Sequence, residues 1–180
     1  MPTTTLLKLG DPAPAFALPG VDGQTYRLSD FDGKAVVCVI FMCNHCPYVK
    51  ATIDRMLALQ RDYESRGVQL VGINANETRN YPEDDLAHMV QWAKAKHFNF
   101  PYLRDETQAV ARAYGAERTP HIFLFDRDRK LRYTGALDDN TQDPSKVTRR
   151  YLRDAIDALL ANRPVGESQT SAMGCSIKWA

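Results

Sequence analysis

Two cysteines separated by two residues are the part of this 180-residue sequence best suited to chemistry. The motif is Cys43-Asn44-His45-Cys46. Two thiols at this spacing can pass between dithiol and disulfide, or can supply half of a zinc site. An apolar, β-branched run over residues 35–42 precedes the motif, and a helical pattern begins near Pro47. We therefore expect the thiols to lie between a buried strand and a helix.

The position at the start of a helix predicts how the thiols react. Backbone N–H groups without helical partners and the positive end of the helix dipole both stabilise a thiolate. His45, when protonated, adds a positive charge between the two sulfurs. We expect the pKa of Cys43 to fall from about 8.5 into the ~3.5–7.5 range, so that Cys43 attacks and Cys46 resolves the mixed disulfide. Pro47 suits the first helical turn because it has no N–H to leave unpaired.

A zinc site is the main alternative interpretation of the two thiols. Structural zinc takes four ligands, whereas His45 lies between the cysteines and His88, His97 and His121 are scattered along the chain. We therefore predict neither a metal nor another cofactor at the motif. A non-catalytic metal carrier or redox-sensing module stays open as a function of a different class.

The other two cysteines have different surroundings. Cys38 lies inside the apolar run, and we expect it to be buried and inert. Cys175 belongs to a tail over residues 163–180, whose apolar side chains suit docking on a single domain formed by residues 1–162. Docking leaves two roles open for Cys175, a structural one and that of a third redox thiol near the motif.

The pattern along the chain predicts an α/β fold. Buried strands alternate with amphipathic helices, which favours a central mixed sheet flanked by helices, parallel in its first half and antiparallel at one edge, with an N-terminal β-hairpin added. The strands are expected at residues 16–18, 25–28, 35–42, 68–73, 98–103, 121–125 and 130–134. The helices are expected at residues 47–66, from Pro82 onward, at 106–114 and at 144–161.

Composition and charge exclude several classes of protein. The 23 basic and 22 acidic residues are mixed along the chain, for a net charge of +1, which argues against a nucleic-acid arm or a membrane-surface patch. No segment approaches the length of a membrane span, and residues 1–8 lack the pattern of a secretory signal. Four cysteines are too few for a disulfide-stapled secreted fold of this size. We therefore expect a cytoplasmic protein whose oligomeric state is left open.

The sequence resembles the thioredoxin-like superfamily, and within it the redoxin branch of alkyl hydroperoxide reductase and thiol-specific antioxidant proteins. The similarity lies in residues 10–18, residues 28–34, residues 41–47 and Thr119-Pro120, in the family's order. The resemblance implies a thioredoxin-like fold and an oxidoreductase that cycles Cys43 and Cys46 against protein or small-molecule thiols and disulfides. It also implies a cis bond at Thr119-Pro120 beside Cys43, where backbone groups pair with an extended substrate.

The sequence departs from two related patterns. Thioredoxins resemble a Trp-Cys-Gly-Pro-Cys pattern with a buried Asp in the preceding strand, whereas here Met42 precedes the motif and residues 35–42 contain no acid. Glu77 or a water would then have to accept the proton of Cys46. Peroxiredoxins resemble a Pro-x-x-x-Thr-x-x-Cys pattern, whereas Cys43 stands three residues before Cys46. This favours disulfide exchange, with a thiol peroxidase resolved by Cys46 or Cys175 as the alternative.

Overall fold

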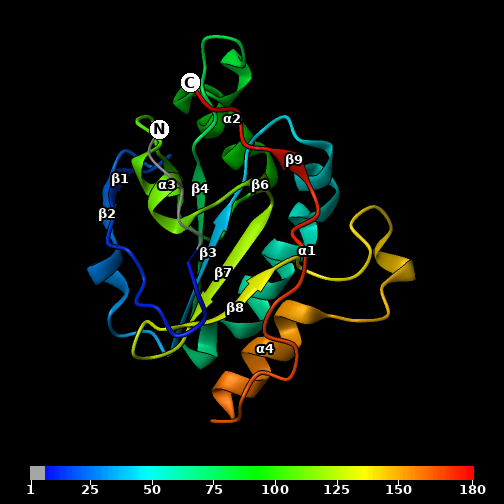
Figure 1. Ribbon diagram of the computed structural model, residues 1–180. Helices are drawn as coiled ribbons and strands as arrows, with labels where there is room; N and C mark the ends of the chain where they lie inside the picture. Colours follow the sequence, from blue (N-terminus) through cyan, green and yellow to red (C-terminus); the bar gives the residue numbers. More distant parts are fainter. Residues whose placement is uncertain (1–6) are drawn as a thin grey trace.

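The computed structural model describes residues 7–180, and its centre is a mixed sheet of five strands (Figure 1). The strand order is β5-β4-β3-β7-β8. β3, β4 and β5 run parallel to one another, and β7 is antiparallel to both of its neighbours. This is the thioredoxin-like α/β fold that we expected. The strands span Val36–Phe41 (β3), Val68–Asn74 (β4), Tyr102–Arg104 (β5), His121–Phe125 (β7) and Leu131–Gly135 (β8).

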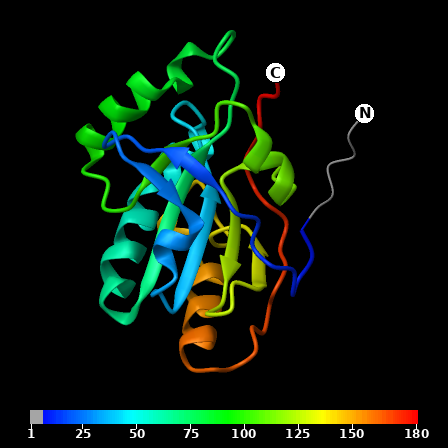
Figure 2. The ribbon, with the colours of Figure 1, turned by 90° about the vertical axis from the view of Figure 1, so that its left-hand side faces the viewer.

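Helices and a hairpin cover the two faces of the sheet. On one face, α1 (Pro47–Tyr63), α2 (Leu86–Lys96) and α4 (Tyr151–Leu160) contribute to a single hydrophobic cluster. On the other face, α3 (Ala109–Tyr114) packs with the N-terminal segment that carries the hairpin of β1 (Ala17–Pro19) and β2 (Thr25–Arg27). Figure 2 shows the hairpin lying in front of the sheet. The expected N-terminal β-hairpin is therefore present.

β3 is buried on both faces, which explains its unbroken apolar sequence. Val36, Cys38 and Ile40 face the α1 side, while the alternate residues of β3 face the α3 side. Burial raises the pKa of the Cys38 thiol. Cys38 is thus a small core residue, as the sequence predicts.

Two of the expected helices begin later than their sequence patterns indicate. Residues Pro82–Asp84 form one 3-10 turn, and α2 starts only where the Asp85 side chain accepts a hydrogen bond from the His88 N–H at 2.9 Å. Residues Pro144–Lys146 form another 3-10 turn, and α4 starts at Tyr151 because Thr148 is instead bonded to Asp139. Local side-chain hydrogen bonds to the backbone compete with the helix in both places.

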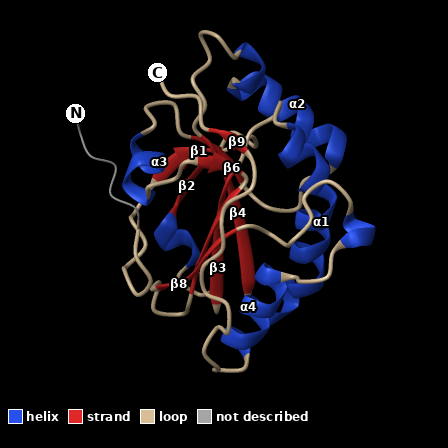
Figure 3. Cartoon of the chain, turned by 45° about the vertical axis from the view of Figure 1, so that its right-hand side comes forward, coloured by secondary structure: helices blue, strands red, loops and turns tan. Residues whose placement is uncertain are grey.

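Residues 163–180 run back along the body of the protein (Figure 3). β9 (Cys175–Ser176) pairs antiparallel with β6 (Arg118–Thr119), the short strand next to Pro120. Ile177 is 3% exposed and lies in the hydrophobic cluster on the α3 face. The Arg112 guanidinium stacks 4.4 Å above the centre of the Trp179 ring.

Two predictions concern the relation of the chain to membranes and secretion. Across residues 7–180, no helix is both long enough and apolar enough to cross a bilayer. The prediction that the N-terminus lacks a secretory signal depends partly on residues 1–6, which lie outside the described residues.

The buried His121 is expected to make the stability of the fold depend on pH. Burial, with a smaller contribution from the charge of Arg118, lowers the pKa of His121 to about 4. Below about pH 6.5 the unfolded chain takes up a proton that the folded chain does not take up until about pH 4, so stability falls as the pH falls through this window. As the pH falls from about 7 to about 5, we expect protonation of His121 in the unfolded chain to lower the free energy of unfolding by about 2 kcal/mol.

Urea unfolding of wild type and His121→Gln at both pH values measures this contribution. The variant should lose less stability than wild type on acidification, since the carboxylates that also titrate are common to both proteins. Equal losses in the two proteins would assign the pH dependence to other groups.

Candidate active site

The Cys-x-x-Cys motif connects the end of β3 to the start of α1. Cys46 is the N-cap of α1, with backbone angles φ −69° and ψ 123°, and Pro47 occupies the first helical position. Proline is favoured there because its missing N–H would have no helical partner. Cys43 and Cys46 are 1% and 0% exposed, so both thiols are buried.

The loop before β7 contacts both sulfurs. The Cys43 Sγ lies 3.6 Å from the Thr119 hydroxyl, and the Cys46 Sγ lies 3.3 Å from the Thr119 carbonyl oxygen. The Thr119-Pro120 peptide bond is cis, and Thr119 is 2% exposed. The structure therefore brings the two motif cysteines and the Thr119-Pro120 loop, all singled out in the sequence, into one buried site.

The surroundings of Cys46 favour its thiolate. The hydrogen bond from the Cys43 thiol is the main cause that lowers the pKa of Cys46, and it outweighs the opposing effect of burial. The Cys175 thiol and the backbone N–H groups of Val49 and Cys175 contribute further. The Val49 N–H is one of the unpaired donors at the helix N-terminus. The Thr119 carbonyl oxygen can accept a hydrogen bond from Cys46 only when the Cys46 thiol is protonated.

The surroundings of Cys43 disfavour its thiolate. Its hydrogen bond to Cys46 raises the pKa of Cys43, and burial and the negative charge of Asp84 raise it further. That Cys43 is the thiol that ionises stays a prediction, because two coupled thiols titrate as a pair. Cys46, rather than Cys43, caps the helix, and two thiols in contact share a single charge.

Asp84 is a buried carboxylate that the sequence analysis missed. It is 0% exposed and lies in the 3-10 turn before α2. One of its oxygens accepts the Asn44 N–H at 2.7 Å, and the other accepts the Asn76 side-chain amide at 3.0 Å and is in contact with His45 Nδ1. A buried carboxylate costs several kcal/mol unless such donors surround it. Asp84 therefore belongs to the architecture of the motif, although it lies on a distant segment.

His45 and Glu77 differ from their expected roles. The His45 ring stacks on Tyr81, with 5.3 Å between ring centres, and turns its Nδ1 toward Asp84. Any charge on His45 is thus balanced by a carboxylate and does not lie free between the two sulfurs. Glu77 accepts three hydrogen bonds within its own turn, from Arg79 and Asn80. Asp84, by contrast, has a carboxylate oxygen within 4.8 Å of the Cys43 sulfur.

Ligand atoms of Cys43, His45 and Asp84 all lie within 4.8 Å of one another. A thiolate, an imidazole and a carboxylate can all serve as zinc ligands. Here the contact between His45 and Asp84 and the two amide hydrogen bonds to Asp84 account for the arrangement. The sequence analysis did not pair these residues because Asp84 is remote from the motif along the chain.

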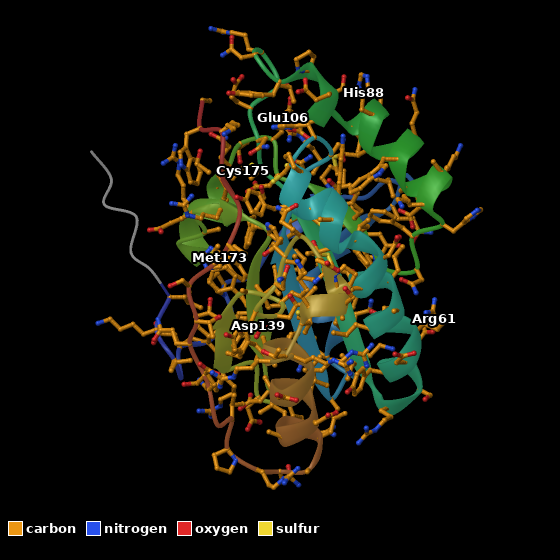
Figure 4. The ribbon with its side chains drawn as sticks, turned by 90° about the vertical axis from the view of Figure 1, so that its right-hand side faces the viewer. Arg61, His88, Glu106, Asp139, Met173 and Cys175 are labelled. Atoms are coloured by element: carbon orange, nitrogen blue, oxygen red, sulfur yellow. The ribbon has the colours of Figure 1, made fainter. Side chains whose placement is uncertain are left out.

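Cys175 lies on β9, next to the motif. Figure 4 labels it on the C-terminal segment, above Met173 and beside the first turns of α1. Its side chain is partly exposed and packs against the hydrophobic cluster that contains Cys43 and Cys46. Burial, together with the neighbouring Cys46, raises the pKa of Cys175 to about 11. The site thus contains three cysteines.

The similarities to known proteins cover most of the chain. The family model described as Redoxin matches residues 8–151. The thiol-disulfide oxidoreductase ResA of Geobacillus thermodenitrificans (strain NG80-2) is 27% identical over 128 residues, which are 71% of this chain and 69% of ResA. MT2597 of Mycobacterium tuberculosis, whose name contains the word peroxiredoxin, is 30% identical over 140 residues, 78% of this chain and 84% of that protein.

A solved structure is similar over nearly the whole chain. The crystal structure of a conserved protein from Geobacillus kaustophilus has a TM-score of 0.92 and 46% sequence identity, covering 98% of this chain and 94% of that one. The match extends beyond the family region and takes in most of the C-terminal tail. The names of the two curated relatives both refer to thiol redox chemistry.

Proposed function

This chain belongs to the Redoxin family of thioredoxin-like proteins, and we propose from that premise that Cys43 and Cys46 form its redox-active pair. Membership in the family makes the protein a thioredoxin-like oxidoreductase with a general function in thiol redox chemistry. The observation that carries the specific proposal is the geometry at the start of α1. Cys46 is the N-cap of the helix, and the Thr119 loop contacts both sulfurs, so we propose that the two thiols share one proton.

In the proposed reaction the Cys46 thiolate attacks one sulfur of a substrate disulfide. This forms a mixed disulfide at Cys46 and releases the other half of the substrate as a thiolate. Cys43 then gives up its proton and attacks the Cys46 sulfur, which releases the second half and leaves a Cys43–Cys46 disulfide. Two electrons pass from the pair to the substrate. The same steps in reverse oxidise a substrate dithiol.

Asp84 is the group that we propose as acceptor of the Cys43 proton. An oxygen of its carboxylate lies within 4.8 Å of the Cys43 sulfur, and His45 belongs to the same cluster. The negative charge of Asp84 holds the proton on Cys43 in the resting state, because it raises the pKa of that thiol. The same charge makes the carboxylate a base close to the sulfur that must ionise. His45 positions Asp84, and Pro47 makes Cys46 the helix cap.

The edge beside cis-Pro120 is the proposed docking position for the substrate. Thr119 contacts both sulfurs, and its backbone belongs to β6, a strand with a pairing edge. Extended peptides commonly bind by adding a strand to such an edge. Protein or small-molecule disulfides are therefore the substrates that we propose.

The reduction potential tests the shared proton directly. If one thiolate and one thiol persist from about pH 5 to 8, reduction adds two electrons and one proton, and the potential should fall by about 30 mV per pH unit. Because the thiolate stabilises the reduced state, we also expect a potential above about −270 mV, toward the oxidising end of the fold's range. Glutathione redox titrations at several pH values, read by the mass shift of alkylated protein, measure both quantities.

A slope near 60 mV per pH unit would mean that both thiols are protonated, and it would remove the basis of the proposal. Cys38 supplies the internal reference. Its thiol is buried in β3 and should stay unlabelled in the folded protein at every potential.

A thiol peroxidase is the second candidate. The observation that favours it is that Cys46 stands at a helix N-terminus, where a thiolate is stabilised, with a second thiol three residues before it. Attack on a hydroperoxide would give a sulfenic acid at Cys46 and an alcohol, and Cys43 or Cys175 would then form a disulfide and release water. Peroxide consumption no faster than that of free cysteine would discard this candidate.

For the organisation and location of the protein, we propose one redox domain over residues 1–162 and a docked tail over residues 163–180. The pairing of β9 with β6 supports the docked tail. We propose the cytoplasm as the site of action, because four cysteines are too few for a secreted fold held by disulfides.

A further inference from the structure

The backbone edge proposed for substrate docking is already paired within the chain. β9 lies beside β6 (Figure 3) and pairs with it antiparallel. The register places Cys175 opposite Thr119 and Ser176 opposite Arg118. β9 therefore lies where an added peptide strand would lie, next to cis-Pro120. A substrate peptide cannot pair with this edge until β9 leaves it.

Gly174 allows the tail to approach the site this closely. A Cβ atom at Gly174 would lie 1.9 Å from the Thr119 carbonyl oxygen, which no side chain can tolerate without movement of the backbone. The Arg118 guanidinium donates to the Gly174 carbonyl oxygen at 3.1 Å, from the same short strand. The sequence before Cys175 thus suits a tight contact with the Thr119-Pro120 loop.

Contacts on both sides of Cys175 fix its position along the edge. After it, the Ile177 N–H donates to the Glu117 carbonyl at 2.9 Å, and the Lys178 N–H donates to the Asn76 side chain at 2.9 Å. Before it, the Thr170 N–H donates to the Thr134 carbonyl at 3.1 Å. Cys175 is therefore held opposite Thr119, whose carbonyl oxygen lies 3.3 Å from the Cys46 sulfur, as the cysteine of a bound substrate would be.

The three thiols differ in exposure. Cys43 and Cys46 are almost completely buried, whereas Cys175 is partly exposed on the outermost strand. A thiol of another molecule can reach the sulfur of Cys175 without displacing the tail, while the sulfurs of Cys43 and Cys46 lie beneath it. Cys175 therefore lies between the buried pair and the surface, where it can exchange with both the pair and outside thiols.

We infer that β9 is a built-in substrate strand whose Cys175 forms a disulfide with Cys46, and that outside thiols exchange with the site at the Cys175 sulfur. This inference rests on the proposed function, because it assigns a third thiol to the same exchange. In the first step, the buried pair is oxidised to the Cys43–Cys46 disulfide as proposed above, and its two electrons reduce the substrate disulfide. Cys175 then loses its proton and attacks the Cys46 sulfur, which releases Cys43 as a thiolate and forms the Cys46–Cys175 disulfide.

The electrostatics favour this order of events. Once Cys46 is part of a disulfide, it no longer carries the charge and hydrogen bond that help to hold the proton on Cys175. An outside thiolate then attacks the Cys175 sulfur, and Cys46 leaves as the stabilised thiolate. A second outside thiolate then attacks the sulfur of the first outside thiol in the new mixed disulfide. This releases Cys175, which takes up a proton. Two electrons have entered, and the dithiol state is restored.

Disulfide mapping in the Cys43→Ser variant tests the inference. This variant keeps Cys46 and Cys175 and removes the competing resolving thiol. After oxidation with glutathione disulfide, alkylation of free thiols and digestion, we expect a peptide in which Cys46 and Cys175 are joined. A glutathione adduct on Cys46 with Cys175 alkylated would overturn the inference, because the two sulfurs would then fail to react although they are in contact.

A pair of glycine variants tests the covering role of the strand. Gly174→Ala places a methyl group against the Thr119 carbonyl, whereas Gly166→Ala adds one to open space in the same tail. In the Cys43→Ser background, only Gly174→Ala should lose the Cys46–Cys175 peptide and accumulate the glutathione adduct, and its Cys46 should be alkylated faster. Equal behaviour of the two glycine variants would contradict a strand that presents Cys175.

Failure of this inference can be told apart from failure of the proposed function. If Cys175→Ser exchanges disulfides as fast as wild type while loss of Cys46 abolishes exchange, only the role of the tail is wrong. If loss of Cys46 leaves exchange intact, the assignment of the buried pair is wrong as well.

Discussion

In the Cys43→Ser variant, Cys46 is expected to react with iodoacetamide at a rate that changes little between about pH 5 and 8. Its thiolate keeps the backbone donors of Val49 and Cys175, and the serine hydroxyl can replace the Cys43 thiol as a donor. In Cys46→Ser the remaining thiol, Cys43, lies buried near the negative charge of Asp84. Its alkylation should rise about tenfold per pH unit, as for a thiol well below its pKa.

Both substitutions should abolish multiple-turnover reduction of glutathione disulfide through the Cys43–Cys46 disulfide, because one sulfur cannot close it. They differ in the half-reaction that survives. In the Cys175→Ser background, Cys43→Ser should release one glutathione thiolate in a burst, whereas Cys46→Ser should be slower in this first step by about tenfold or more near neutral pH. Stopped-flow release of glutathione and alkylation mass spectrometry report the two quantities.

Cys38→Ser is the matched control, since that thiol is buried in β3 and takes no part in exchange. If the alkylation rate were independent of pH in Cys46→Ser and rose steeply with pH in Cys43→Ser, Cys43 would be the thiol that is ionised near neutral pH. The roles of the two cysteines would then be the reverse of those proposed above.

The sequence predicts where the thiols lie better than it predicts which of them ionises. The unbroken run over residues 35–42 can only be a strand with both faces covered, and the structure buries every residue of β3. The helix after it is equally clear, so the motif had to lie at a helix N-terminus. The signal that separates the two cysteines is Pro47, because proline at the first helical position makes the preceding Cys46 the cap.

Other features of the site depend on contacts between distant segments. The sequence 82–85 looks like the acidic first turn of a helix, and Asp85 does cap α2. Nothing local distinguishes it from Asp84, which instead turns inward toward Asn44 and Asn76. The pairing of β9 with β6 is equally hidden, since a two-residue strand has no periodicity.

Loss of the Asp84 carboxylate is expected to slow the second half-reaction, closure of the Cys43–Cys46 disulfide, by about a hundredfold. Asp84→Asn keeps the shape of the side chain but removes the base nearest to Cys43, so mixed disulfides at Cys46 should persist. The first attack should keep its rate, because the donors to Cys46 do not include Asp84. Single-turnover decay of a glutathione adduct at Cys46, measured in the Cys175→Ser background to exclude the tail thiol, gives the rate of closure.

Stability separates the positioning role of Asp84 from its proposed role as a base. Asp84→Ala leaves the Asn44 N–H and the Asn76 amide without their buried acceptor and should lower the free energy of unfolding by about 3–5 kcal/mol. Asp85→Asn is the matched control, because it alters the adjacent acid, which is partly exposed and caps α2. Closure as fast in Asp84→Asn as in Asp85→Asn would show that the buried carboxylate holds the motif in place without taking the proton of Cys43.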